Sequence, residues 1–144
     1  YDTHDGLIGQ HEGLLEQVDE ALDAFYRSTV EIGISDKVTT FTASDFGRTL
    51  ASNGDGSDHG WGSHHFILGG DVDGGRFYGR APHISVDTDD QVGQGRLLPD
   101  ISVDQYSATL ARWFGVSSSE MTSVAPNIGR FASSDLGFMK EGAI

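Results

Sequence analysis

The chain has 144 residues, enough for one domain with a modest core, and we expect residues 1–144 to form a single domain. Its net charge of −13 argues against nucleic acid and anionic membrane surfaces as partners, because binding phosphate needs clustered Lys and Arg. No stretch comes near the ~18 consecutive apolar residues that a membrane span needs. There is no cysteine, so a metal site would have to use His and carboxylate ligands.

The first predicted elements are a long helix and a strand. Over residues 5–33, apolar side chains recur every three or four positions with acidic side chains on the other face, which predicts an amphipathic helix. The β-branched and aromatic residues 37–44 predict a buried strand. With Tyr1-Asp2 as the end of a preceding strand, this order suggests half of a βαβ unit. The predicted fold class is therefore α/β, with a partly parallel sheet flanked by helices.

The middle of the chain is less regular. Residues 45–65 are rich in Gly, Asp, Ser and His and predict a long loop, beginning where open α/β sheets place their ligands. Residues 65–81 alternate apolar runs with Gly pairs, which predicts a β-hairpin or a pair of edge strands. Residues 81–101 are expected to be irregular.

Two helices are predicted near the C-terminus. Ser102 and Gln105 form a capping box, which predicts a helix over residues 103–114. A second, short helix is expected to start near Ser118 and to stop before Pro126.

Histidines gather in the predicted loop, where Asp58 and His59 are followed by His64 and His65. Nitrogen and oxygen ligands converge within about 2.0–2.2 Å of a zinc ion, and neutral imidazoles and carboxylates supply both kinds. If a strand follows, only one of His64 and His65 can point toward such a site, and the sequence leaves open which.

A second group of ligand types, Asp2 and His4, lies at the predicted junction of strand and helix. In a parallel sheet both groups would lie at the same edge, so together they predict a metal site. Arg48 is the one basic residue near these clusters in the sequence. Its guanidinium suits a phosphate or sulfate oxygen, or else an ion pair among the many acids.

Several blocks resemble the C-terminal part of the DUF1501 family, namely DTHD (2–5), VTTFTASDFGRTLASNGDGSDHGWGSHHFILGG (38–70), GGRFYG (74–79), VGQGRLLP (92–99) and SVDQYSATLARWFGVSSSEM (102–121). That family is similar to the alkaline phosphatase and sulfatase superfamily. The resemblance implies an alkaline-phosphatase-like sandwich with two metals at the carboxyl edge of its sheet. Asp58 and His59 match the Asp-His-Gly motif, and Asp2 matches an earlier aspartate. The histidine partner of Asp2 would be His4, although the superfamily usually spaces that pair four residues apart. A later histidine ligand would be His65, or His64 as the alternative.

The resemblance also implies a function, a metal-dependent hydrolase of small anionic phosphate or sulfate esters. The cofactor would be a divalent metal, zinc first, with manganese or calcium as alternatives, and Arg48 would orient the anion. The nucleophile would lie upstream, outside this chain, so we expect the chain to be a C-terminal fragment whose partner is the N-terminal half. Family members look like bacterial proteins exported by the twin-arginine pathway, which implies a periplasmic or extracellular location.

Two other readings of the sequence stay open. The same residues could hold a structural metal in a non-catalytic exported binding or assembly protein. The chain could also be a soluble α/β domain whose histidines only pack the loop.

Overall fold

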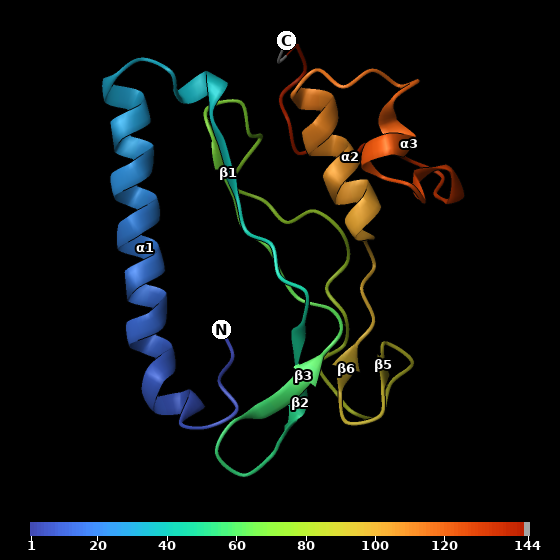
Figure 1. Ribbon diagram of the computed structural model, residues 1–144. Helices are drawn as coiled ribbons and strands as arrows, with labels where there is room; N and C mark the ends of the chain where they lie inside the picture. The colour runs from blue at the N-terminus through green and yellow to red at the C-terminus, as the bar shows by residue number, and fades with distance from the viewer. Residues whose placement is uncertain (143–144) are drawn as a thin grey trace.

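The computed structural model describes residues 1–142. Figure 1 shows one long helix on one side, short strands in the middle and the C-terminal helices on the other side. The elements in chain order are α1 (Leu7–Glu31), the 3₁₀ turn η1 (Ser35–Lys37), β1 (Thr39–Phe41), β2 (Gly47–Ser52), β3 (Ser57–Gly60), β4 (Ile67–Gly69), β5 (Gln91–Val92), β6 (Arg96–Leu97), α2 (Val103–Trp113), α3 (Met121–Val124) and the 3₁₀ turn η2 (Ile128–Arg130).

Helix α1 confirms the prediction for residues 5–33, and both of its ends have an identifiable cause. At its start, the Asp55 carboxylate accepts a hydrogen bond from the Gly6 amide at 3.0 Å, and the Asp55 carbonyl accepts one from the Leu7 amide at 3.1 Å. These contacts satisfy amides that a helix start leaves unpaired. At its end, Gly33 adopts a φ of 73°, a left-handed conformation that glycine allows without strain.

The strands form three two-stranded sheets, and each pair is antiparallel: β1 with β4, β2 with β3, and β5 with β6. The mixture of helices and strands is confirmed, whereas no parallel pair occurs among residues 1–142. The predicted strand 37–44 is three residues long as β1, and the expected strand end at Tyr1-Asp2 has no strand conformation.

The prediction of a long loop over residues 45–65 is wrong, because much of this segment is the β2–β3 hairpin. Its glycines permit close packing: a Cβ atom on Gly60 would lie 2.8 Å from the Arg48 carbonyl oxygen. In the turn, the Asn53 side-chain oxygen accepts a hydrogen bond from the Gly56 amide at 2.9 Å. The glycine content that indicated a loop is thus part of a hairpin.

Two further predictions for the middle of the chain need correction. Residues 65–81 do not form a hairpin; they contain only the short strand β4, whose Leu68 pairs with Thr40 of β1. Residues 81–101 include the small β5–β6 hairpin in addition to irregular backbone.

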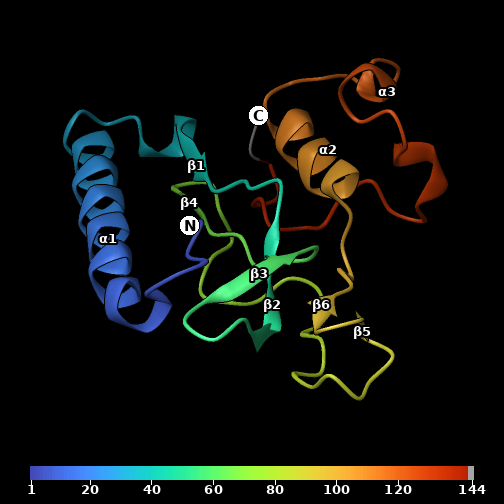
Figure 2. The ribbon, with the colours of Figure 1, turned by 60° about the horizontal axis from the view of Figure 1, so that its bottom comes forward.

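The C-terminal helices confirm their predictions. Ser102 caps α2 through its side chain, and the capping box with Gln105 is present. The helices α2 and α3 pack around a small core of Ala108, Met121, Ala125 and Ile128. Figure 2 shows this helical part beside the β5–β6 hairpin.

Helix α1 differs from this packed part in its exposure. Thr29 is its one buried residue, and apolar side chains of its stripe such as Leu15 and Phe25 are 46% and 50% exposed. None of the helices in the described chain combines the length and the apolar character that crossing a membrane requires.

Candidate metal centre

The N-terminal segment is held against strand β3. The Ser57 amide donates to the Thr3 carbonyl at 3.4 Å, and the Asn53 side-chain amide donates to the His4 carbonyl at 3.0 Å. Gly56 makes this approach possible, since a Cβ atom there would lie 2.4 Å from the Thr3 carbonyl oxygen. Residues about 55 positions apart in the sequence therefore become neighbours.

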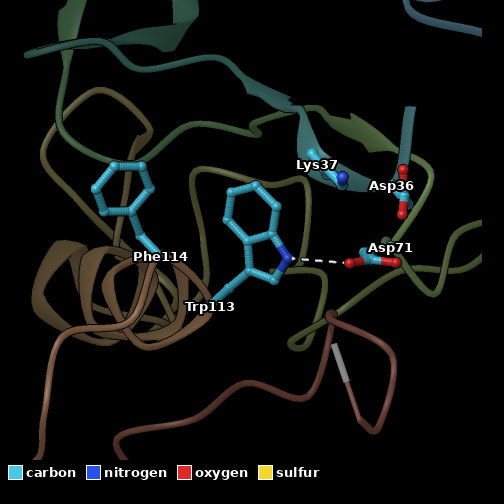
Figure 3. A pocket seen from close by; sticks show the side chains of 5 residues that line it. All are labelled: Asp36, Lys37, Asp71, Trp113 and Phe114. Atoms are coloured by element: carbon cyan, nitrogen blue, oxygen red, sulfur yellow. Dashed lines mark hydrogen bonds between the residues drawn. The ribbon is translucent and has the colours of Figure 1, made fainter. Parts of the chain in front are cut away.

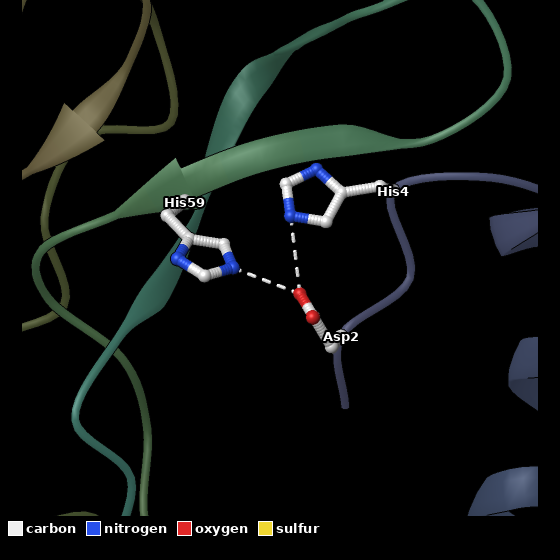
Figure 4. A group of neighbouring side chains, drawn as sticks. All are labelled: Asp2, His4 and His59. Atoms are coloured by element: carbon white, nitrogen blue, oxygen red, sulfur yellow. Dashed lines mark hydrogen bonds and ion pairs between the residues drawn. The ribbon is translucent and has the colours of Figure 1, made fainter.

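Three side chains meet at this junction, and Figure 4 shows both imidazoles directed at one carboxylate. The Asp2 Oδ1 atom lies 2.8 Å from His59 Nε2 and 3.1 Å from His4 Nε2. One potential ligand atom from each of the three residues lies within 4.8 Å of the other two, and all three residues are exposed. The structure thus brings together the two groups of residues that the sequence singled out.

Asp58 lies at the edge of this group. Its Oδ1 atom is 3.6 Å from His4 Nδ1, and it accepts a hydrogen bond from the Asn53 side-chain amide at 3.2 Å. Asp58 and His59 are neighbours on a strand, so their side chains leave opposite faces of the hairpin. Asp58 therefore reaches His4 from the side away from His59.

Aromatic packing fixes the orientation of His59. The Phe46 ring stacks on the His59 ring with a centroid separation of 4.0 Å and an interplanar angle of 4°, and His4 stacks on His59 at 4.8 Å. Because ring planes packed in this way restrict rotation, the Nε2 edge of His59 stays directed at Asp2.

The electrostatics favour an ionised carboxylate. The hydrogen bond with His59, together with the charges of His4, His59 and Arg48, lowers the pKa of the Asp2 carboxyl group and outweighs the opposing effect of desolvation. An ionised carboxylate beside two imidazoles is a ligand set that binds borderline divalent metals such as zinc.

Arg48 uses its guanidinium within the protein. It donates from Nε to the Tyr1 carbonyl at 3.2 Å, from Nη1 to the Ser57 carbonyl at 2.9 Å and from Nη2 to Asp2 Oδ1 at 3.2 Å. Its side chain is only 19% exposed. The sequence allowed Arg48 either to bind an anion or to form an ion pair, and the geometry shows the ion pair with Asp2. The contacts of Arg48 also connect the N-terminal segment to β3.

His64 and His65 lie outside the Asp2–His4–His59 group. His65 Nδ1 is 3.3 Å from the Thr42 hydroxyl, and its ring stacks on Tyr106 at 5.7 Å. Burial, with a smaller effect of the charge of His64, lowers the pKa of His65. The structure therefore does not bring the predicted later histidine to the candidate metal centre.

Sequence reasoning missed two residues that support the centre. Phe46 holds the His59 ring, and Asn53 bonds both the His4 carbonyl and the Asp58 carboxylate. The Asn53-Gly54 pair is a sequence signal for a tight turn between strands, and it would have indicated the hairpin that places both side chains.

Comparison with known proteins identifies the family and no more. A family model described as "Protein of unknown function (DUF1501)" matches residues 1–125, a span that contains the candidate metal centre and the helices α1 to α3. No curated protein and no solved structure matches the chain. Because the family model covers most of its length, the chain belongs to the DUF1501 family.

Proposed function

We propose that the chain carries the metal-binding part of a hydrolase that cleaves phosphate or sulfate esters. Asp2, His4 and His59 would hold a divalent ion, zinc first among the candidates. The observation that carries the proposal is the convergence of one carboxylate and two imidazoles, all within 4.8 Å, from two distant parts of the chain. Metal bound in this way acts as a Lewis acid toward an ester oxygen and activates water as a nucleophile.

The exposure of the three residues supports a catalytic role over a structural one. A structural zinc is closed by four protein ligands, whereas a catalytic zinc has three and keeps one position for water or substrate. The Asp2–His4–His59 group offers three ligands on an exposed surface. An ester can therefore approach the ion from solvent.

The remaining parts of the proposal rest on the family resemblance. They are an alkaline-phosphatase-like sandwich, export across the inner membrane, a second metal ion, and an N-terminal half of the protein that supplies the nucleophile. Arg48 takes a different part from the one first considered, because its donors already bond Tyr1, Ser57 and Asp2. We assign it to positioning the ligand Asp2.

A non-catalytic metal site is the second candidate, and one contact favours it. Asp58 Oδ1 lies 3.6 Å from His4 Nδ1, so Asp58 can complete a set of four protein ligands if the ion is held through that nitrogen of His4. The two candidates differ in whether water remains on the metal. Cobalt substitution separates them, because the visible spectrum of a cobalt site with bound water changes when phosphate is added.

The first test is zinc binding by isothermal titration calorimetry. His59→Ala is compared with His83→Ala, which removes a histidine outside the group. We expect the unsubstituted chain and His83→Ala to bind one zinc equally. We expect His59→Ala to bind more weakly by over about tenfold, since even an outer-shell partner of a metal ligand is worth about 10- to 100-fold.

Activity is measured next, as release of p-nitrophenol from its phosphate and sulfate esters by the zinc-loaded protein with its N-terminal half. Failure to bind zinc, or equal binding by both histidine variants, would overturn the ligand assignment. Zinc binding without any hydrolysis by the longer protein would favour the structural site.

A further inference from the structure

A second candidate site lies away from the metal centre, where three segments meet (Figure 3). Its walls are Asp36 and Lys37 of η1, Asp71 after β4, and Trp113 and Phe114 at the end of α2, and together they line an open pocket of about 340 Å³. None of these residues belongs to the Asp2–His4–His59 group. We propose that this pocket binds a small organic cation, specifically an alkylammonium group.

The aromatic wall gives the first reason. Trp113 Nε1 donates a hydrogen bond to Asp71 Oδ2 at 3.4 Å, so the edge of the indole is tied to a carboxylate. Figure 3 shows the indole between Phe114 and Asp71, and Phe114 is 81% exposed. An indole face attracts cations through its quadrupole, and tryptophan does so more strongly than the other aromatic residues.

Charge gives the second reason. The two carboxylates of Asp36 and Asp71 outnumber the single ammonium of Lys37 in the pocket wall. Within residues 1–142, no ion pair shorter than 4.0 Å involves any of these three residues. Both carboxylates can therefore interact with a bound cation.

The backbone gives the third reason. Trp113 is the last residue of α2, a helix of 11 residues, so the pocket lies at the helix C-terminus. The carbonyl groups at that end carry partial negative charge and favour cations. Indole, carboxylates and helix end thus act in the same direction, and the net charge of −13 raises the concentration of cations near the surface.

The composition of the walls decides which kind of cation fits. Calcium and magnesium bind oxygen ligands and keep bound water, so they make no use of the two aromatic rings in the pocket wall. An alkylammonium group has apolar methyl or methylene groups for the rings and a positive charge for the carboxylates. The position of Lys37 in the wall works against the ligand and gives a substitution that should strengthen binding.

The test follows the indole N–H resonance of Trp113 by NMR while tetramethylammonium chloride is added at constant ionic strength. We expect a saturable shift with Kd of the order of 10 mM, which is weak because few groups contribute. tert-Butanol, a neutral molecule of similar shape, is expected to give no saturable shift. The Trp61 indole N–H in the same spectrum is the internal control.

Three variants make the test specific. Asp71→Asn keeps an oxygen to accept from Trp113 and removes the charge, and we expect it to weaken binding about threefold. Asp87→Asn removes the same charge from an exposed loop outside the pocket and is expected to leave Kd unchanged. Lys37→Gln is expected to strengthen binding about twofold.

A second probe distinguishes the source of the ammonium group. If Nα-acetyl-lysine amide binds at least as tightly as tetramethylammonium, the ligand is assigned as a lysine side chain of another protein. If it binds more weakly, the ligand is assigned as a free quaternary ammonium compound. No saturable shift with either cation would overturn the proposal. So would an equal shift with tert-butanol, or equal weakening by Asp71→Asn and Asp87→Asn.

Discussion

Replacing Arg48 by Gln is expected to weaken zinc binding even though Arg48 is not among the ligands. The side chain is 19% exposed and donates to the carbonyls of Tyr1 and Ser57, in addition to its contact with Asp2. Hydrogen bonds of this kind contribute about 1 kcal/mol each. The bond to Ser57 lies within the β2–β3 hairpin, so only the loss of the bond to Tyr1 weakens the docking of the N-terminal segment, by about 1 kcal/mol, with the exposed Asp2 pair left out of the sum.

The effect on affinity follows from the population of the docked segment. When only a fraction of the molecules holds Asp2 and His4 beside His59, the apparent Kd for zinc rises in inverse proportion to that fraction. A loss of about 1 kcal/mol corresponds to a factor of about 5, so we expect a roughly 3- to 5-fold increase in Kd, less if the docked state starts with a large surplus of stability.

The assay is calorimetry with zinc, with hydrogen exchange at the Ser57 amide as an independent measure of docking. Arg76→Gln is the matched control, because Arg76 is an exposed arginine paired only with Asp73. We expect faster Ser57 exchange and weaker zinc binding in Arg48→Gln and no change in Arg76→Gln. Unchanged zinc binding in Arg48→Gln would refute this reasoning. If phosphate then also inhibits ester hydrolysis less strongly in this variant, Arg48 has a role in anion binding instead.

Gly56→Ala places a Cβ atom 2.4 Å from the Thr3 carbonyl oxygen, so we expect weaker zinc binding in calorimetry and a melting temperature lower by several degrees. Gly74→Ala is the control: Gly74 has open space around it, so we expect both quantities to stay unchanged. Desolvation raises the pKa of Tyr106 to about 12, so absorbance at alkaline pH is expected to show a late-ionising phenol that Tyr106→Phe removes. Because the same phenol ionises near pH 10 when unfolded, its contribution to stability is lost as pH rises from about 10 to 12, and melting curves that stay level there would contradict this. Burial lowers the pKa of His65, so the unfolded chain takes up the proton first as pH falls, and stability decreases below about pH 6.5. His65→Gln is expected to reduce that decrease in thermal melts. An identical pH profile in this variant would count against His65 as the cause.

The helices could be predicted because their signals are local. The periodic stripe of α1 and the capping box of α2 depend on residues within a few positions of one another, and the structure follows both. The β2–β3 hairpin has one local signal, the Asn53-Gly54 pair, but the glycines around this pair also suit a loop. Gly56 lies there because the backbone of Thr3 and His4 passes close to it, and that cause involves residues far away in the sequence.

The candidate metal centre was predicted by its residue types, although the reasoning about its geometry was wrong. A shared edge of a parallel sheet was expected to join Asp2 with His59; instead, the N-terminal segment lies along an antiparallel hairpin. The family resemblance implies a later histidine in the site, His65 or else His64. The chain between His59 and His65 leaves β3, and His65 lies beside Thr42 and Tyr106.

The turn between β2 and β3 serves two parts of the molecule at once. Asp55 in this turn binds the first amides of α1, while Asn53 in the same turn holds His4 and Asp58. Since the apolar stripe of α1 is exposed or only half-buried, the helix depends strongly on the contacts at its ends. Order at the ligand residues is therefore thermodynamically linked to helix content, and a 25-residue helix reports, through circular dichroism, what happens at a cluster of three side chains.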